Sequence, residues 1–292
     1  MQPQVRYQRL ALLGVGYIGG SAGLAARRAG VVGEIVGYDP SPAAIQAAIR
    51  MGILDASATS PEEALVGASL VLLAAPVRSM HDLMHAIASA LLPETAVIDV
   101  GSVKAGIVAA AEAILPAGCF VGCHPMAGAE FSGVEAADAN IFAGRICFIC
   151  PSRNARESSV EAAHDFWRGV GCQTATIEPE THDRLMAAQS HLPHVAAYAL
   201  AGSLAPAMPF LENTTTVASP TTSLRDTTRI AASGPAVWRD ILLANAAHVL
   251  PLIQELETRV AEIKAAVVGG DGEALERILT AAQSCRKRLV KE

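Results

Sequence analysis

Residues 9–19 read Arg-Leu-Ala-Leu-Leu-Gly-Val-Gly-Tyr-Ile-Gly, an apolar run that leads into three glycines spaced Gly-x-Gly-x-x-Gly. This order is typical of the strand, turn and helix that open a dinucleotide-binding βαβ unit. The spacing alone is a weak signal, because glycines also close ordinary strand-to-helix turns. Here a second apolar run ends at Asp39, 20 residues after Gly19, where such units place an acidic residue. The stretch therefore predicts a nucleotide site near the N-terminus.

Each position of this fingerprint has an expected task. Gly14 would make the turn, Gly16 would let the backbone approach the pyrophosphate, and Gly19 would let helix and strand pack closely. The phosphates would lie at the helix N-terminus. A carboxylate at Asp39 would bind the ribose hydroxyls and repel a 2′-phosphate, which favours NAD over NADP; alternatively, Asp39 is only a turn residue before Pro40. The residues expected to bind the cofactor are Gly14, Gly16, Tyr17, Ile18, Gly19, Asp39 and Pro76.

From residue 9 to about 177, short apolar runs alternate with amphipathic, alanine-rich stretches. This alternation predicts an α/β fold, in which a mainly parallel, doubly wound sheet forms a Rossmann-type domain over residues 1–177. The expected strands are 9–13, 34–38, 70–74, 96–99, 120–123, 146–150 and 173–176. The expected helices are 17–29, 42–51, 80–91, 103–114 and 155–170.

The remainder of the chain, residues 178–292, has long apolar-periodic stretches without β-branched runs, which predicts an all-helical C-terminal domain. The apolar fraction of its helices exceeds what one small bundle would bury, so we expect a homodimer through this domain. The expected helical stretches are 184–204, 237–267 and 273–290. Pro206, Pro209 and Pro220, with threonines at 214–216, predict a long irregular connection between them.

Composition narrows the class of partner. The chain has 292 residues, of which 51% are hydrophobic, and a formal net charge of -6 without a long Lys/Arg block. These values indicate a sizeable core and argue against nucleic acid or an anionic membrane as the main partner, so we expect a small-molecule substrate. The N-terminus is polar, and apolar runs are shorter than the roughly 20 residues of a membrane span. We therefore expect a cytoplasmic protein.

Six cysteines lie in mostly apolar stretches, as expected for reduced, buried thiols. Cys147 and Cys150 have the CxxC spacing of metal and redox sites. In a strand, however, residues i and i+3 point to opposite faces, so this pair would not converge on a metal. His81 and His85 could share one helix face but lack a third ligand nearby in the sequence. We expect no metal site.

Two motifs follow predicted strands at the carboxyl edge, where open α/β sheets bind ligands. Ser102, in Asp-Val-Gly-Ser-Val-Lys (99–104), either places a hydroxyl near the nicotinamide or is the N-cap of the next helix. His124, in His-Pro-Met-Ala-Gly (124–128), stands where the chain leaves the sheet. A histidine there can accept the proton released when an alcohol loses hydride, or it only satisfies backbone groups. Together with the nucleotide fingerprint, these residues predict a dehydrogenase.

A second histidine cluster, Ser-His-Leu-Pro-His (190–194), lies in an otherwise helical stretch. Its proline would break or kink the helix. The break would present His191 and His194 to a substrate site between domains, or would serve packing alone. Farther along, Arg229 offers a guanidinium fork to a carboxylate, unless it only joins an ion-pair cluster at a helix start. The remaining histidines, His164, His182 and His248, carry no distinguishing context.

Taken together, these motifs resemble those of the prephenate/arogenate dehydrogenase (TyrA) family, of the cyclohexadienyl dehydrogenase type, nearly end to end. The pairing of His-Pro-Met-Ala-Gly with Ser-His-Leu-Pro-His is the most specific element. The resemblance implies that prephenate gives hydride to NAD and loses its ring carboxylate as carbon dioxide, forming 4-hydroxyphenylpyruvate in tyrosine biosynthesis. The segments that carry it are 14–19, 99–104, 122–128, 190–194, 226–231 and 238–240.

The resemblance also implies a role for each candidate residue. His124 would accept the proton of the 4-hydroxyl group, and Ser102 would hydrogen-bond the same hydroxyl and align His124 with the nicotinamide. Arg229 would hold the ring carboxylate. His194, or in its place His191, would contact the side chain of the substrate.

Two features bear on the choice of substrate. Glu130 looks like the acidic residue that gates the site through an ionic contact in prephenate-using members, which favours prephenate over arogenate. The segment 219–227 departs from the family pattern, because Leu224 and Thr227 replace aromatic residues. This departure leaves open the choice between the pyruvyl group of prephenate and the alanyl group of arogenate.

Two other classes of protein fit part of the pattern. A 3-hydroxyacid dehydrogenase usually has a catalytic lysine in its helical domain, whereas Lys264 is the only lysine between residues 178 and 269. A non-catalytic nucleotide sensor would need none of the residues Ser102, His124 and Arg229.

Overall fold

The computed structural model describes residues 5–128, 132–213 and 221–290. Its centre is an eight-stranded sheet with the order β3-β2-β1-β4-β5-β6-β7-β8. All neighbouring strands pair in parallel except β6 and β7, which are antiparallel. The strands are β1 (Tyr7–Leu13), β2 (Val32–Tyr38), β3 (Ala56–Ser57), β4 (Leu70–Leu73), β5 (Ala96–Asp99), β6 (Phe120–Pro125), β7 (Ile146–Pro151) and β8 (Gln173–Thr176).

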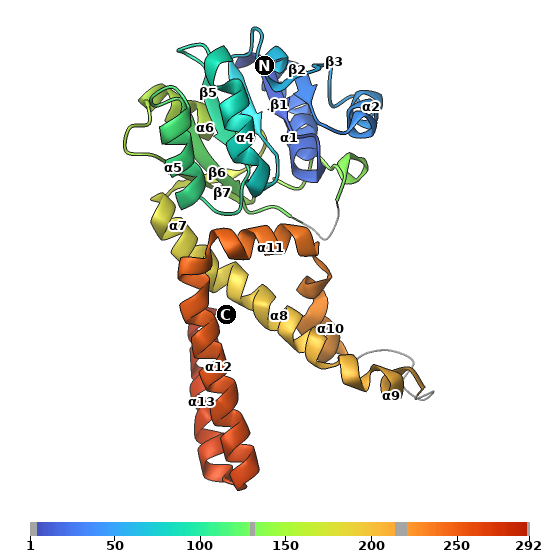
Figure 1. Cartoon of the computed structure of the whole chain (residues 1–292), viewed down its shortest axis with the longest axis vertical. Coiled ribbons are helices and arrows are strands. Elements are labelled where there is room, and N and C mark those ends of the chain that lie inside the picture. Colours follow the sequence, from blue (N-terminus) through green and yellow to red (C-terminus); the bar gives the residue numbers. More distant parts are fainter. Residues whose placement is uncertain (1–4, 129–131, 214–220, 291–292) are drawn as a thin grey trace. The chain divides into compact units, whose positions relative to one another are not determined.

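Helices cover both faces of this sheet, as Figure 1 shows. Alternate strand residues supply the two core layers, because successive side chains of a strand point to opposite faces. Leu10 and Leu12 belong to one layer, with residues of α1, α2 and α6. Ala11 and Leu13 belong to the other layer, with residues of α3, α4 and α5. The helices are α1 (Tyr17–Arg28), α2 (Pro42–Arg50), α3 (Pro61–Ala64), α4 (Val77–Ile87), α5 (Ala105–Ile114) and α6 (Glu157–Gly169).

The doubly wound fold expected from the sequence is therefore confirmed. Each of the seven expected strands is present, with ends that shift by at most two residues. The eighth strand, β3, was not expected, because two residues are too few to show a hydrophobic alternation. From β1, the strands are added toward β3 on one side and, starting with β4, toward β6 on the other. The order therefore reverses between β1 and β4, which is where open α/β sheets bind their ligands.

The rest of the chain is helical, as expected, but two of the three expected stretches, 184–204 and 237–267, are divided into shorter helices. The stretch 184–204 divides into α7 (Pro179–Met186), a π-helical turn η3 (Ala187–His191) and α8 (Leu192–Ser203). The connection expected to be irregular is partly helical, because α9 (Met208–Asn213) follows a 3₁₀ turn at Ala205–Ala207. Two further helices are α10 (Thr222–Thr228) and α11 (Pro235–Ala244).

By backbone contacts, residues 1–245 and residues 246–292 form two compact units. The second unit is an antiparallel pair of helices, α12 (Ala246–Gly269) and α13 (Gly272–Leu289). A single helix over 237–267 is not formed, because Asn245 separates α11 from α12. Within the described residues, no single helix is long and apolar enough to cross a membrane, and α11 with α12 meets that criterion only as a bent pair.

Candidate active site

The glycine fingerprint forms a tight turn between β1 and α1. Gly14 has a φ of 99°, and a Cβ built on it would lie 2.5 Å from the carbonyl oxygen of Ala74. A Cβ on Gly19 would lie 2.2 Å from the carbonyl oxygen of Gly14. In contrast, a Cβ on Gly16 would meet nothing within 4 Å. The first and third glycines are thus required by packing, and Gly16 faces the open space that a phosphate group would need.

Asp39 follows β2 and its carboxylate ties two backbone segments together. One oxygen accepts a hydrogen bond from the Val15 N–H at 2.9 Å, inside the fingerprint. The other accepts from the Ser41 N–H at 2.8 Å, which is the turn contact that the alternative interpretation expected. Both contacts hold Asp39 against the fingerprint, and each oxygen keeps a second lone pair for a ribose hydroxyl.

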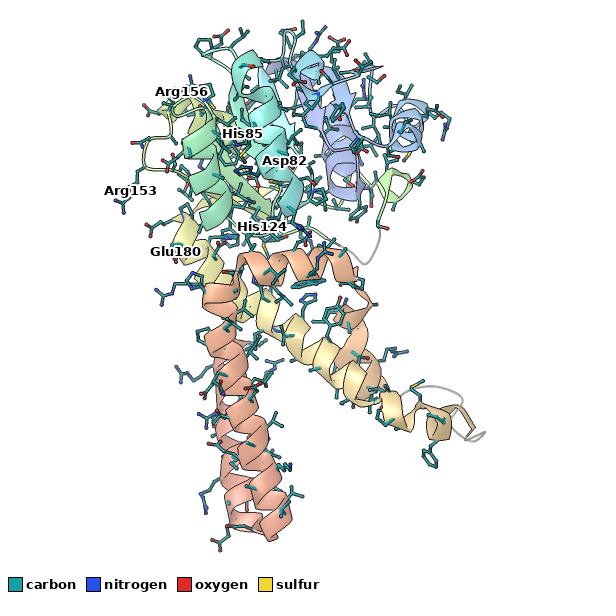
Figure 2. All side chains as sticks on the ribbon, viewed as in Figure 1. Asp82, His85, His124, Arg153, Arg156 and Glu180 are labelled. Carbon is teal, nitrogen blue, oxygen red and sulfur yellow. The ribbon has the colours of Figure 1, made fainter. Side chains whose placement is uncertain are left out.

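At the carboxyl edge of the same sheet, His124 is the penultimate residue of β6 (Figure 2). Its Nδ1 lies 2.9 Å from Nε2 of His182, which belongs to α7. The Nδ1 of His182 lies in turn 2.8 Å from a carboxylate oxygen of Asp183. Two imidazoles and a carboxylate therefore form a linear chain that begins at the candidate base and ends in the protein interior.

Asp183 is held at the start of α5. Its carboxylate accepts hydrogen bonds from the N–H groups of Lys104 and Ala105, at 2.7 and 2.9 Å. These are the orphan donors of a helix N-terminus, where negative charge is favoured. Ser102 is not the N-cap of this helix, because α5 begins two residues later than expected and Lys104 occupies the N-cap position. The alternative role of Ser102 as the N-cap is therefore wrong.

Behind the site, Asp99 and Lys104 form an ion pair whose side chains are both fully buried. Asp99 also accepts hydrogen bonds from the N–H of Gly101 at 2.8 Å and from the N–H of Cys123 at 2.7 Å. The Lys104 ammonium donates to the Cys123 carbonyl oxygen at 2.9 Å. Because Gly101 precedes Ser102 and Cys123 precedes His124, one buried pair fixes the backbone beside both candidate residues.

The pKa shifts at this site favour a neutral His124 and a negatively charged Asp183. Burial lowers the pKa of His124 well below its usual value, and electrostatic interactions with His182, Lys104 and His191 act in the same direction. Burial acts to raise the pKa of Asp183, but hydrogen bonds from His182 and from the start of α5 outweigh it and lower that pKa. At neutral pH, His124 can therefore accept a proton while Asp183 carries a negative charge.

The second histidine cluster follows α7 directly. The π-helical turn η3 widens the helix by one residue before Pro193, whose ring would otherwise clash with the carbonyl group four residues earlier. The carbonyl group of Ser190 accepts a hydrogen bond from Nδ1 of His194 at 2.9 Å. The His194 ring stacks on Trp238 of α11, with centroids 3.5 Å apart. Burial, and the nearby charge of Arg229, lower the pKa of His194.

The two histidines of this cluster have different surroundings. His191 is buried, and its Nδ1 lies 3.0 Å from the Nδ2 of Asn245. That amide also donates to the carbonyl oxygen of Asp183 at 2.8 Å. His194 is only half-buried. Of the two, His194 has the geometry for contact with a ligand, whereas His191 is enclosed by protein groups.

Most of the predicted residues converge on one edge of the sheet. The fingerprint, Ser102 and His124 come from the carboxyl ends of β1, β5 and β6, and Pro76 is the N-cap of α4 after β4. Arg229 begins the 3₁₀ turn Arg229–Ala232 and is exposed. Glu130 lies outside the described residues, as do Ser219 and Pro220 of the atypical segment.

The sequence interpretation missed His182 and Asp183. We treated His182 as a histidine without context, although it is buried and bonded to His124. The available signal was a His-Asp pair placed directly after the last expected strand, at the start of a helix. The pairing of Asp99 with Lys104 carried no sequence signal beyond their shared motif.

Both parts of the chain match models of domains from one protein family. Residues 22–176 match the family model of the prephenate dehydrogenase nucleotide-binding domain. Residues 178–281 match that of the prephenate dehydrogenase dimerization domain. The two matches meet next to Ile177, immediately after the last strand of the sheet.

Individual relatives match along most of their own length. The chain is 31% identical over 283 residues to a cyclohexadienyl dehydrogenase of Zymomonas mobilis, which covers 97% of this chain and 96% of that one. It is 33% identical over 284 residues to a prephenate dehydrogenase of Bacillus subtilis, with coverages of 96% and 76%. The fold is similar to the crystal structure of the A. aeolicus prephenate dehydrogenase in complex with hydroxyphenyl propionate and NAD+, with a TM-score of 0.85, 33% identity and coverages of 97% and 98%.

Proposed function

This chain belongs to the prephenate dehydrogenase family, and we propose that it oxidises prephenate with NAD, releasing carbon dioxide and forming 4-hydroxyphenylpyruvate. The observation that carries the proposal is the position of His124, a neutral imidazole at the carboxyl edge of a nucleotide-binding sheet. The family assignment removes the support for a 3-hydroxyacid dehydrogenase and for a non-catalytic sensor.

The cofactor residues fit a dinucleotide. Gly16 leaves open space at the N-terminus of α1, next to Tyr17 and Ile18, where backbone N–H groups favour phosphate. Asp39 stands at the end of β2, where its carboxylate would bind ribose hydroxyls and disfavour a 2′-phosphate. When bound, NAD would accept the hydride from the ring carbon that bears the hydroxyl. Gly14 and Gly19 shape the turn, and Pro76 lines the next strand end.

His124 would take the proton of the substrate hydroxyl as the hydride leaves the same carbon. Ser102 would donate or accept a hydrogen bond at that hydroxyl and align it with His124. Ser102 follows β5 and His124 lies near the end of the neighbouring parallel strand β6, so both residues are at the same edge of the sheet. Loss of the ring carboxylate as carbon dioxide then leaves its electron pair in the ring, which becomes aromatic.

Arg229 would bind a substrate carboxylate through the two N–H groups of its fork. Its charge acts on His194, which places the two side chains in one neighbourhood. The His194 ring, stacked on Trp238, would contact the substrate side chain with its free Nε2. His191 is the less favoured candidate for this contact because it is buried. A gating role for Glu130 stays a prediction.

The first test is the absorbance of reduced nicotinamide with purified protein, with prephenate and arogenate each offered NAD and NADP. We expect turnover of prephenate with NAD, and the ratio to arogenate measures the choice of substrate. A His124→Asn variant should bind NAD normally and turn over no substrate. Silence of the wild-type protein with all four pairs would overturn the proposal, and full turnover by the variant would remove His124 from its role.

The proposal also covers the oligomeric state of the protein and its location in the cell. We expect a homodimer through the helical domain over residues 178–292, separate from a nucleotide domain over 1–177. Support comes from exposed apolar side chains on α12 and α13, among them Val260, Val267 and Val268, and from the match to a dimerization domain. A cytoplasmic location fits the same picture. Light scattering after size exclusion should give twice the chain mass, and a monomer would contradict the dimer.

A further inference from the structure

Two hydrogen bonds link Asp183 to His182 and His182 to His124, and together they restrict where the ring protons lie. An ionised carboxylate only accepts hydrogen bonds, so the proton between Asp183 and His182 belongs to Nδ1 of His182. In the form of His182 that carries this single ring proton, Nε2 bears a lone pair. The contact of 2.9 Å between this atom and Nδ1 of His124 therefore requires a proton on His124 Nδ1. By elimination, the lone pair of a neutral His124 lies on Nε2.

We propose that His182 and Asp183 are positioning residues that hold His124 in the one tautomer able to accept the substrate proton and that stabilise the imidazolium formed. This inference rests on the proposed function, since it concerns the same hydroxyl proton. Neither residue needs to touch the substrate. Each acts through His124, as the third member of a nucleophile-base-acid triad acts through its histidine.

The proton transfer can be written with its atoms balanced. The O–H bond of the substrate hydroxyl breaks, its electron pair stays on oxygen, and a new N–H bond forms at Nε2 of His124. The cation formed on His124 shares its Nδ1 proton with His182, whose own Nδ1 proton points at the Asp183 carboxylate. No proton has to leave Asp183 or reach it. The negative charge of Asp183 offsets the positive charge at the moment when it appears.

Asp183 is the group whose charge stabilises the imidazolium of His124, because the other ionisable groups that face His124 provide no net negative charge. The Lys104 ammonium is paired with Asp99, so that pair carries no net charge. The buried His191 accepts a hydrogen bond from Asn245 and is neutral, since burial lowers its pKa to about 4. The titratable and charged groups around His124 are His182 and Asp183 on α7, Asp99 on β5, Lys104 before α5, Cys123 beside it on β6, and His191 on η3.

Two variants of His182 test whether it orients the His124 ring and stabilises the charge that forms on it. His182→Gln keeps the polarity of the chain, because an amide can accept from His124 with its oxygen and donate to Asp183 with its nitrogen. His182→Leu removes both contacts. For the leucine variant we expect kcat with prephenate and NAD to fall on the order of 10²-fold, with an unchanged KM for NAD. The acid limb of kcat/KM should move to lower pH, because the imidazolium loses its stabilisation. The glutamine variant should recover at least part of the lost kcat.

Three outcomes decide the matter. A leucine variant with wild-type kcat and an unmoved acid limb overturns the inference, and so does one that loses kcat without any movement of the limb, since that marks a merely structural role. A silent wild-type enzyme refutes the proposed function instead. Where the leucine variant fails to fold, ¹⁵N chemical shifts of the wild-type histidine rings give the answer. Protonated Nδ1 and bare Nε2 on His124 at neutral pH support the inference, and the opposite tautomer refutes it.

Discussion

The buried ion pair behind the site should behave as one energetic unit. Lys104→Met leaves the Asp99 carboxylate buried without its cation, and Asp99→Asn leaves the ammonium buried without its anion. Breaking one partner of such a pair costs about 3–5 kcal/mol. Asp99 retains two backbone N–H donors, which places Lys104→Met near the lower figure. At roughly 2–4 °C per kcal/mol, each single variant should lower the Tm by roughly 6–20 °C. The double variant keeps no unpaired charge and should cost less than the sum by about 2 kcal/mol.

Urea unfolding followed by tryptophan fluorescence measures these costs, because Trp167 and Trp238 are both buried in the same unit. The matched control is Arg6→Met, which removes an ion pair of 2.8 Å with Asp165 whose side chains are each 49% exposed. Exposed pairs contribute about 0–1 kcal/mol, so this variant should unfold almost like the wild type. If the costs of Asp99→Asn and Lys104→Met add to within about 0.5 kcal/mol in the double variant, the two groups do not act as a unit.

Two glycines of the fingerprint should affect different properties. Gly19→Ala should lower the Tm, because its Cβ would lie 2.2 Å from a carbonyl oxygen. Gly16→Ala should keep the wild-type Tm and raise the KM for NAD. Equal Tm values for both would contradict this. Arg229→Lys should raise the KM for prephenate roughly tenfold, because an ammonium lacks the fork, with the KM for NAD as internal control. Acid should destabilise the fold: burial lowers the pKa of His191 from 6.5 to about 4, so the unfolded chain binds a proton that the folded chain does not. The stability given by neutral His191 is complete above pH 6.5 and is lost as the pH falls to about 4, on the order of 3 kcal/mol. Urea titrations at pH 7 and pH 5 test this, and equal acid sensitivity of wild type and His191→Gln would refute it.

The fold was predictable because its signals are local. Apolar runs of four to seven residues, separated by alanine-rich periodic stretches, mark strands and helices without knowledge of their neighbours. The end of each strand then locates Ser102 and His124 at one edge of the sheet, since parallel strands share their direction. Two residues of the site could thus be named before any packing was known.

The rest of the site depends on distances that no local pattern contains. His182 meets His124 across 58 residues of chain, and Asp183 meets Lys104 across 79. A histidine in a helix has the same local sequence appearance whether it faces solvent or another imidazole. The N-cap of α5 was misjudged for the same reason, because a side chain from another helix satisfies its N–H groups.

The π-helical turn η3 makes the geometry of this site sensitive to a single residue. It joins the helix of His182 to the helix of His194, and it holds one residue more than an α-helical turn would. Deleting that residue would let the α-helix continue and rotate α8 by about 100° about its axis relative to α7. His194 would then lose its stacking on Trp238 although no residue of the site had been substituted. In this chain, therefore, the number of residues between His182 and His194 determines the geometry of the site as much as the identity of the two histidines does.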